Sequence, residues 1–220
     1  MVARALPATS HTHTSVKKGG HTVNKESIPL NLMWHIDAII HLYPVTIVTT
    51  LDTLGRVNAA PFSLVLPFCS SADNPQMLLI AHTQWHTARN IEATREFVIN
   101  YPRAEQVQDV VATSRHYPPG LNELEYTAYS TLPSNKVAPP RIAECYQHIE
   151  CRLAQVLRPS EMQVNFIADV LDVSLDAGVY GLHRDERIRR INPPVYFGAD
   201  ETMHHLFGKI AEVQMVAVPV

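Results

Sequence analysis

Residues 44–63 constrain the fold of this chain more than any other segment, because they carry the pattern of two paired strands. The segment opens with PVTIVTT, which is rich in β-branched residues; Asp52 and Gly55 then stand at turn positions, and Val57 begins a second run of apolar and small residues. β-Branched residues favour strands, whereas aspartate and glycine favour tight turns. The segment therefore predicts a strand, a tight turn and a second strand that runs into a loop with an accessible backbone.

The second half of this segment carries residues suited to contact with a flat ligand. Ala59 and Ala60 are small enough to let a ring approach the main chain, and Asn58 and Ser63 offer directed hydrogen bonds beside it. An asparagine next to a turn often does no more than cap that turn. Because Ser63 and a second polar block accompany Asn58, we favour the ligand-binding interpretation.

The second polar block, residues 85–91, follows an apolar strand pattern. Thr87 is suited to cap a helix that starts here. The free N–H groups and partial positive charge of a helix start attract anions, and Arg89 can add a charge-assisted hydrogen bond. The structural alternatives are a plain N-cap for Thr87, a solvated charge for Arg89 and packing for Trp85.

Further apolar patterns predict several short strands and few helices. Strands are expected over 76–81, 96–100, 146–153 and 166–173, helices over 87–94, 104–113 and 183–190, and a closing segment over 192–198. The stretch from 114 to 140 is rich in proline, tyrosine and polar residues, and it predicts a long excursion or lid. Short strands with few helices favour a mainly β fold, a β-barrel with helical additions.

The first residues of the chain differ from the rest in composition. Residues 1–25 contain four basic residues and no acidic one. This loosely resembles a transit peptide, but no convincing amphipathic pattern accompanies it. We therefore interpret residues 1–28 as a polar N-terminal arm and residues 29–220 as one domain, a size that can bury a substantial core.

Composition argues against several classes of protein. The formal charge of −3 argues against general nucleic-acid binding, which usually requires a basic excess. The longest uncharged stretch, 57–72, is interrupted by prolines and polar residues, so no membrane span is predicted. The three cysteines form no C-x-x-C pair and indicate no disulfide framework, which favours a reducing cytoplasm.

The histidines do not predict a metal site. His82 and His86 are four residues apart, but the first ends a predicted strand and the second precedes a predicted helix, so they share no helix face. His204 and His205 have no third ligand at a recognisable spacing. The sequence also contains neither a G-x-G-x-x-G fingerprint nor a P-loop.

Together these blocks resemble the flavin reductase-like family, whose fold is the FMN-binding split barrel. The resemblance covers roughly residues 42–207. It rests on the order and spacing of Thr49-Thr50, the Asp52 to Gly55 turn, 58–63, 74–78, Thr87-x-x-Asn90-Ile91, 96–100, 142–145, 149–151 and 194–198.

The resemblance implies where a flavin lies. Members of the family hold FMN at a homodimer interface, with the phosphate at the helix start and the rings and ribityl chain beside the second strand. The cofactor-binding residues implied in this chain are Thr49, Asn58, Ala59, Ala60, Ser63, Trp85, Thr87, Arg89 and Asn90. Trp85 departs from the pattern, because many relatives carry a basic residue there. The departure implies that Trp85 stacks on a flavin or nucleotide ring instead, and that phosphate binding is weaker or shifted towards Arg89.

The resemblance also implies an NAD(P)H:flavin oxidoreductase. A hydride passes from C4 of NADH or NADPH to N5 of FMN, a step that needs no protein acid or base, so no catalytic residue is predicted. Tyr196 and His204 are candidates for contact with the nicotinamide. FAD and riboflavin are alternative flavins, and a monooxygenase or another acceptor receives the electrons.

Two other functions fit the same residues. The first is an FMN-binding electron carrier without significant NAD(P)H activity, which differs only in access to the flavin face, and the excursion over 114–140 would control that access. The second is a split-barrel protein that has lost its flavin. Only the departure at Trp85 favours this last interpretation.

Overall fold

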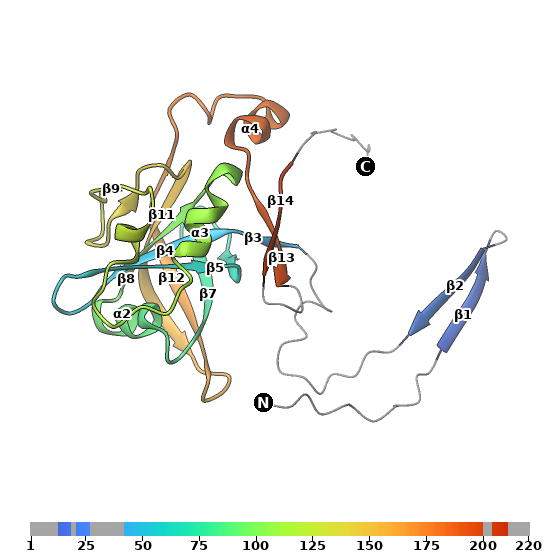
Figure 1. Ribbon diagram of the computed structural model, residues 1–220, viewed down its shortest axis with the longest axis horizontal. Helices are drawn as coiled ribbons and strands as arrows, with labels where there is room; N and C mark the ends of the chain where they lie inside the picture. The colour runs from blue at the N-terminus through green and yellow to red at the C-terminus, as the bar shows by residue number, and fades with distance from the viewer. Residues whose placement is uncertain (1–12, 19–20, 27–41, 200–203, 211–220) are drawn as a thin grey trace. The chain divides into compact units, whose positions relative to one another are not determined.

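The computed structural model describes residues 13–18, 21–26, 42–199 and 204–210, and Figure 1 shows the chain coloured from its N- to its C-terminus. The chain divides into two compact units, residues 1–40 and 41–220. In the first unit, β1 (His13–Lys18) and β2 (His21–Glu26) form an antiparallel hairpin. This hairpin was not predicted, although the Gly-Gly pair between the two strands is typical of a two-residue hairpin turn.

A seven-stranded antiparallel sheet dominates the second unit and curls into a half-barrel (Figure 1). Its strand order is β5-β4-β8-β11-β12-β7-β6. The bounds are β4 (Thr46–Leu51), β5 (Val57–Phe62), β6 (Val65–Cys69), β7 (Gln76–His82), β8 (Glu96–Tyr101), β11 (Gln147–Leu157) and β12 (Gln163–Leu175). The mainly β, split-barrel prediction is confirmed.

Two smaller sheets and a few helices complete this unit. A three-stranded sheet contains β3 (Tyr43–Pro44), β13 (Val195–Ala199) and β14 (His205–Gly208), and β9 (Thr131–Leu132) pairs with β10 (Arg141–Ile142). The helices are α2 (His86–Thr94), α3 (Val107–Ala112) and α4 (Arg184–Ile191), with 3-10 turns η1 (Ala104–Gln106) and η2 (Glu123–Tyr126). In the part of the chain that the structure describes, no helix has the length and apolar character needed to cross a membrane.

The hairpin of β4 and β5 lies between two hydrophobic clusters. Val48 packs in the larger cluster, which includes Ile91 of α2. Ile47 and Ala59 belong to the second cluster, which includes Val110 of α3. Because alternate residues of a strand point to opposite faces, both faces of the hairpin are covered, and β4 is buried along almost its whole length.

The turn of this hairpin follows the predicted chemistry. Asp52 Oδ1 accepts the backbone N–H groups of Leu54 and Arg56, both at 2.9 Å. The hydrogen bond from the Arg56 N–H is the main reason why the pKa of Asp52 lies below its usual value. Gly55 has φ 76°, a conformation that glycine adopts without strain. The predicted loop starts later than expected, because β5 continues to Phe62.

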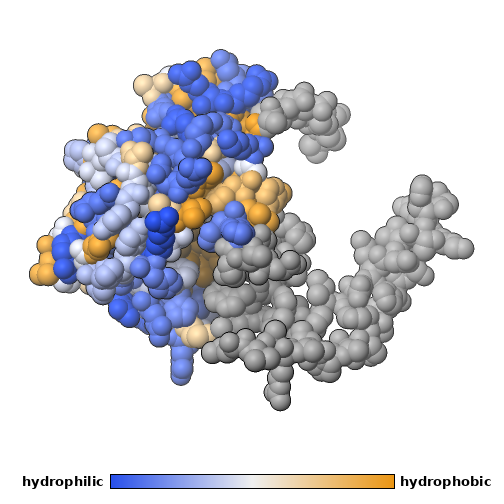
Figure 2. Space-filling view, in the orientation of Figure 1, coloured by the Kyte–Doolittle hydropathy of each residue, from blue (hydrophilic) through white to orange (hydrophobic). Residues whose placement is uncertain are grey.

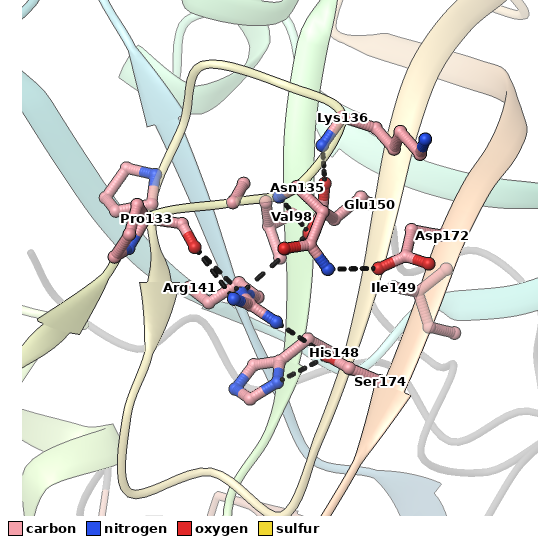
Figure 3. A network of polar contacts seen from close by, with 12 residues as sticks. Val98, Pro133, Asn135, Lys136, Arg141, His148, Ile149, Glu150, Asp172 and Ser174 are labelled. Carbon is pink, nitrogen blue, oxygen red and sulfur yellow. Dashed lines mark hydrogen bonds and ion pairs between the residues drawn. The ribbon is translucent and has the colours of Figure 1, made fainter.

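The far end of the 114–140 segment is attached to the large sheet (Figure 3). Asn135 and Lys136 donate their backbone N–H groups to Glu150 Oε1 and Oε2, at 2.8 and 2.6 Å. The Asn135 side chain also donates to Asp172 Oδ2 at 2.8 Å. We call these contacts the Glu150 clasp. The Glu150 clasp thus fixes this end of the segment to the sheet.

Candidate functional site

A cavity of about 710 Å³ lies between β5, the start of α2 and the first part of the 114–140 segment. Residues of β13 and β14 complete its wall. The volume falls within the range of roughly 300–1,000 Å³ that is usual for small-molecule and cofactor sites.

Six of the nine predicted binding residues line this cavity: Asn58, Ala60, Ser63, Trp85, Thr87 and Arg89. They come from β5 and the residue just after it, and from the start of α2. The fold therefore brings the two polar blocks of the sequence to one place.

The other three residues lie behind the cavity wall. Thr49 and Ala59 are paired across the ladder of β4 and β5, so their side chains share one face of the hairpin. The Thr49 hydroxyl donates to the carbonyl of Pro140 at 2.6 Å. Asn90 donates to the hydroxyl of Thr50 at 3.0 Å. These residues hold the wall in place from outside the cavity.

The start of α2 offers backbone donors to a ligand. Trp85 occupies the N-cap position without a side-chain cap, and the first turn contains no acidic residue. The prediction that Thr87 caps the helix is wrong: Thr87 is the second helical residue, because the chain turns earlier, with the Trp85 N–H donating to the His82 carbonyl at 3.1 Å. Uncapped N–H groups and the helix dipole favour an anion here, with the exposed Arg89 close by.

The Trp85 ring is both packed and accessible. It lies edge-on to Phe62, with 5.5 Å between the ring centroids and 71° between the ring planes. Nevertheless, 46% of its surface is exposed. The contact with Phe62 fixes the ring at the cavity wall and leaves part of it open to a ligand.

A buried glutamate that was not predicted connects η2 to β5. Glu123 is 5% exposed, and its Oε2 accepts the Ala59 N–H at 2.8 Å. In the orientation that satisfies both of its polar groups, the Asn58 amide donates to Glu123 Oε1 and accepts from the Thr87 hydroxyl, each at 3.1 Å. Burial raises the pKa of the Glu123 carboxyl, and the Ala59 hydrogen bond offsets only part of that effect.

The cavity is lined mainly by basic titratable groups. They are Arg89, Arg115 and four histidines, His82, His86, His116 and His205. Within the described residues that line the cavity, Glu123 is the one acidic side chain. This charge distribution favours a ligand that carries negative charge. Arg115 and His116 belong to the 114–140 segment, for which composition indicated a lid and no particular contacts.

Of the two residues predicted to contact the nicotinamide, Tyr196 and His204, only Tyr196 is among the described residues that line the cavity. Tyr196 lines the cavity, and its hydroxyl lies 3.0 Å from His205 Nδ1. His205, and not the predicted His204, is the histidine of this pair that lines the cavity. Across residues 13–18, 21–26, 42–199 and 204–210, no three histidine, cysteine or acidic side chains gather where they could hold a metal ion.

Comparisons with known proteins identify the family and the fold of this chain. A sequence profile of the flavin reductase like domain matches residues 41–192. A protein of unestablished function from Methanothermobacter thermautotrophicus is 31% identical over 166 residues, which cover 73% of this chain and 77% of that protein.

Two solved structures share the fold. Nitrilotriacetate monooxygenase component B from Bacillus cereus has a TM-score of 0.73 and 21% identity, over 86% of this chain and 98% of the other. Flavoredoxin from Desulfovibrio vulgaris (Miyazaki F) has a TM-score of 0.69 and 19% identity, over 87% and 97%.

Proposed function

The chain belongs to the flavin reductase-like domain family, and from this premise we propose that it is an oxidoreductase that binds FMN and is reduced by NADH or NADPH. One observation carries the proposal: residues from two distant sequence blocks, Asn58 and Ser63 on one side and Thr87 and Arg89 on the other, line a single cavity of cofactor size.

The donors around the cavity fit the chemical parts of FMN. The uncapped start of α2 and Arg89 suit a phosphate, because N–H groups and a guanidinium both donate to anionic oxygen. Ala60 leaves space beside β5 for a flat ring system, and the partly exposed Trp85 adds an aromatic surface. When bound, the flavin supplies the hydride-accepting chemistry, and the protein orients it.

The residues that line the cavity and those behind it have different proposed roles. Asn58, Ala60, Ser63, Trp85, Thr87 and Arg89 contact the cofactor directly. Thr49, Ala59 and Asn90 act indirectly, because their side chains are engaged within the wall. FAD shares the flavin ring and remains an alternative ligand of the same donors, as does riboflavin.

The second candidate function is an FMN-binding electron carrier without significant NAD(P)H activity. The similarity in fold to a flavoredoxin favours it. Both functions use the same flavin residues. Anaerobic mixing of the FMN-loaded protein with NADH and with NADPH separates them: bleaching of the flavin absorbance within seconds indicates the reductase, and its persistence indicates the carrier.

We also expect a homodimer with the flavin near its interface, in the cytoplasm. Exposed apolar side chains offer contact area, namely Leu66 and Phe68 on β6 and Phe197 and Leu206 near the three-stranded sheet, where Figure 2 shows apolar surface gathered. All three cysteines are free thiols, as expected in a reducing compartment. The similarity in fold to a monooxygenase component makes an oxygenase a candidate acceptor. Light scattering of the loaded protein tests the dimer.

Flavin binding is tested by titration of the apo-protein with FMN, followed by flavin fluorescence. Micromolar affinity, about −8 kcal/mol, is expected. Thr87→Ala removes a hydroxyl at the helix start and is expected to weaken binding about tenfold, or about 1.4 kcal/mol. Thr94→Ala, at the other end of α2, is the matched control. A protein that binds neither FMN, FAD nor riboflavin would contradict the proposal.

Arg89→Ala tests the charge at the same end of α2. A similar loss of FMN affinity is expected, and it should shrink as salt is added, because the interaction is between charges. Arg190→Ala on α4, which removes another exposed charge, is the control. Riboflavin lacks the phosphate, so it should bind the unmodified protein and Arg89→Ala with equal affinity. If Arg89→Ala loses as much affinity for riboflavin as for FMN, Arg89 contacts another part of the flavin.

A further inference from the structure

Glu123 combines burial, hydrogen bonding and position in a way that its neighbours do not. It belongs to η2, yet its carboxylate reaches β5 and accepts from Ala59 and Asn58, through one oxygen each. Asn58 in turn accepts from Thr87 of α2. Three elements of the cavity wall are therefore connected through this one carboxylate.

Within the described residues, no ion pair neutralises the charge of Glu123. Neither of its oxygens forms an ion pair with a lysine, arginine or histidine in the described chain, and its two hydrogen bonds come from neutral amides. Neutral donors reduce the cost of burying a carboxylate without cancelling its charge. A negative charge in a partly desolvated cavity acts on a bound ligand with little screening.

Reduction of a flavin held here would add charge to this cavity. A hydride comprises two electrons and one proton, so its transfer from a nicotinamide would make the flavin ring one unit more negative and the nicotinamide positive. A carboxylate in the same cavity disfavours the added negative charge, whereas the basic groups that line the cavity favour it.

We propose that Glu123 is a positioning residue that also lowers the reduction potential of the flavin held beside Asn58 and Ala60. This inference rests on the proposed function. It assigns to the first part of the 114–140 segment a role in setting how strongly the reduced cofactor donates electrons, in addition to any role as a lid.

The ionisable groups around Glu123 define what must be kept constant in a test. The strand β5 that packs against η2 carries none, α3 contributes Asp109, and η2 itself adds Glu125 and Tyr126. Across the cavity lie Arg89, Arg115, Tyr117, Tyr196 and the four histidines named above. A change at Glu123 alone leaves all of these in place.

Glu123→Gln is the decisive variant because it removes the charge and keeps the shape. The new amide can accept the Ala59 N–H, and Asn58 can present its oxygen to it, since the Asn58 nitrogen then reaches the hydroxyls of Thr50 at 3.3 Å and Thr87 at 3.1 Å. Glu125→Gln makes the same chemical change two residues away at an exposed position, and it is the matched control.

The measurement is the midpoint potential of the FMN-loaded protein as a function of pH. Glu123→Gln is expected to favour two-electron reduction at least tenfold at pH 8, which corresponds to about 30 mV. Reduction of the unmodified protein should be accompanied by additional proton uptake over the pH range in which Glu123 titrates, and Glu123→Gln should lack this uptake. Glu125→Gln should match the unmodified protein in both respects.

Three results would overturn the inference. The first is an unchanged potential in Glu123→Gln, and the second is a folded Glu123→Gln protein that no longer binds FMN, because the carboxylate would then be a binding group. The third is a rise of equal size in Glu123→Asp, which keeps the charge. If the unmodified protein binds no flavin, the proposed function itself fails, and this outcome is distinguishable from the other three.

Discussion

Two buried glutamates connect the 114–140 segment to the large sheet: Glu123 belongs to the segment and contacts β5, and Glu150 belongs to β11 and contacts the segment. Their surroundings differ. Glu150 is 1% exposed, accepts the N–H groups of Asn135 and Lys136, and has Arg141 Nε 3.8 Å away (Figure 3). Glu123 also accepts two N–H groups, but no cation in the described residues pairs with it. A buried carboxylate with a cation nearby fixes one segment to another. A buried carboxylate without one, if it faces a cavity, can act electrostatically on a ligand there.

The largest effect on stability is expected at Glu150. Glu150→Gln turns an N–H₂ group towards a backbone donor and removes the ion-pair partner of Arg141, which keeps its hydrogen bonds to Pro133 and Ser174. The free energy of unfolding should therefore fall by about 3 kcal/mol. Urea unfolding followed by circular dichroism measures it. FMN affinity should not change, because the clasp lies outside the cavity lining. A loss no larger than that of the exposed Glu125→Gln would remove the distinction between the two glutamates.

A smaller effect on stability is expected from the protonation of His148, which lies beside the Glu150 clasp. Its ring nitrogens lie 2.8 Å from the Ile142 carbonyl and 3.1 Å from Ser174 Oγ. Burial lowers its pKa, so below the ordinary value of about 6.5 the unfolded chain binds a proton that the folded chain does not. Stability contributed by His148 is therefore present at neutral pH and lost as pH falls. In His148→Gln, the free energy of unfolding should depend less on pH below about 6.5 than it does in the unmodified protein.

The smallest effect on stability, with the opposite pH dependence, is expected at Glu123 in the apo-protein. Its pKa is raised in the folded state, so its contribution to stability is present below the unfolded pKa and is lost as pH rises through the folded pKa. Glu123→Gln should therefore be slightly more stable than the unmodified protein at pH 7, and this difference should disappear at low pH. Thermal unfolding of both proteins across pH tests this, and a less stable variant at pH 7 would make the two glutamates alike.

Local chemistry was sufficient to predict the parts of the fold that depend on neighbouring residues. The turn at Asp52 and Gly55 and the strands on either side of it were predicted correctly, because turn residues and β-branched runs act over a few positions. The six predicted residues that line the cavity also belong to two short blocks. Their meeting followed from the family resemblance, since no local rule joins Asn58 to Thr87.

The features that were missed depend on tertiary contacts. Glu123 meets Ala59 across 64 positions, and nothing near either residue indicates the contact. Strand β6 has three exposed residues in succession, one of them Pro67, so it lacks the alternation that marks a half-buried strand. The cap assigned to Thr87 failed because the preceding turn sets where α2 begins, and that turn depends on His82 at the end of β7.

The contact between Glu123 and Ala59 has one more consequence, for association between copies of the chain. β5 is an edge strand of the large sheet, and edge strands with free N–H groups can pair with strands of other molecules. Alternate N–H groups of a strand point outward. At β5, the Ala59 N–H is occupied by Glu123, and Pro61 has no N–H to offer. The carboxylate that faces the cavity thus also occupies an N–H group with which this edge of the sheet could pair with another chain.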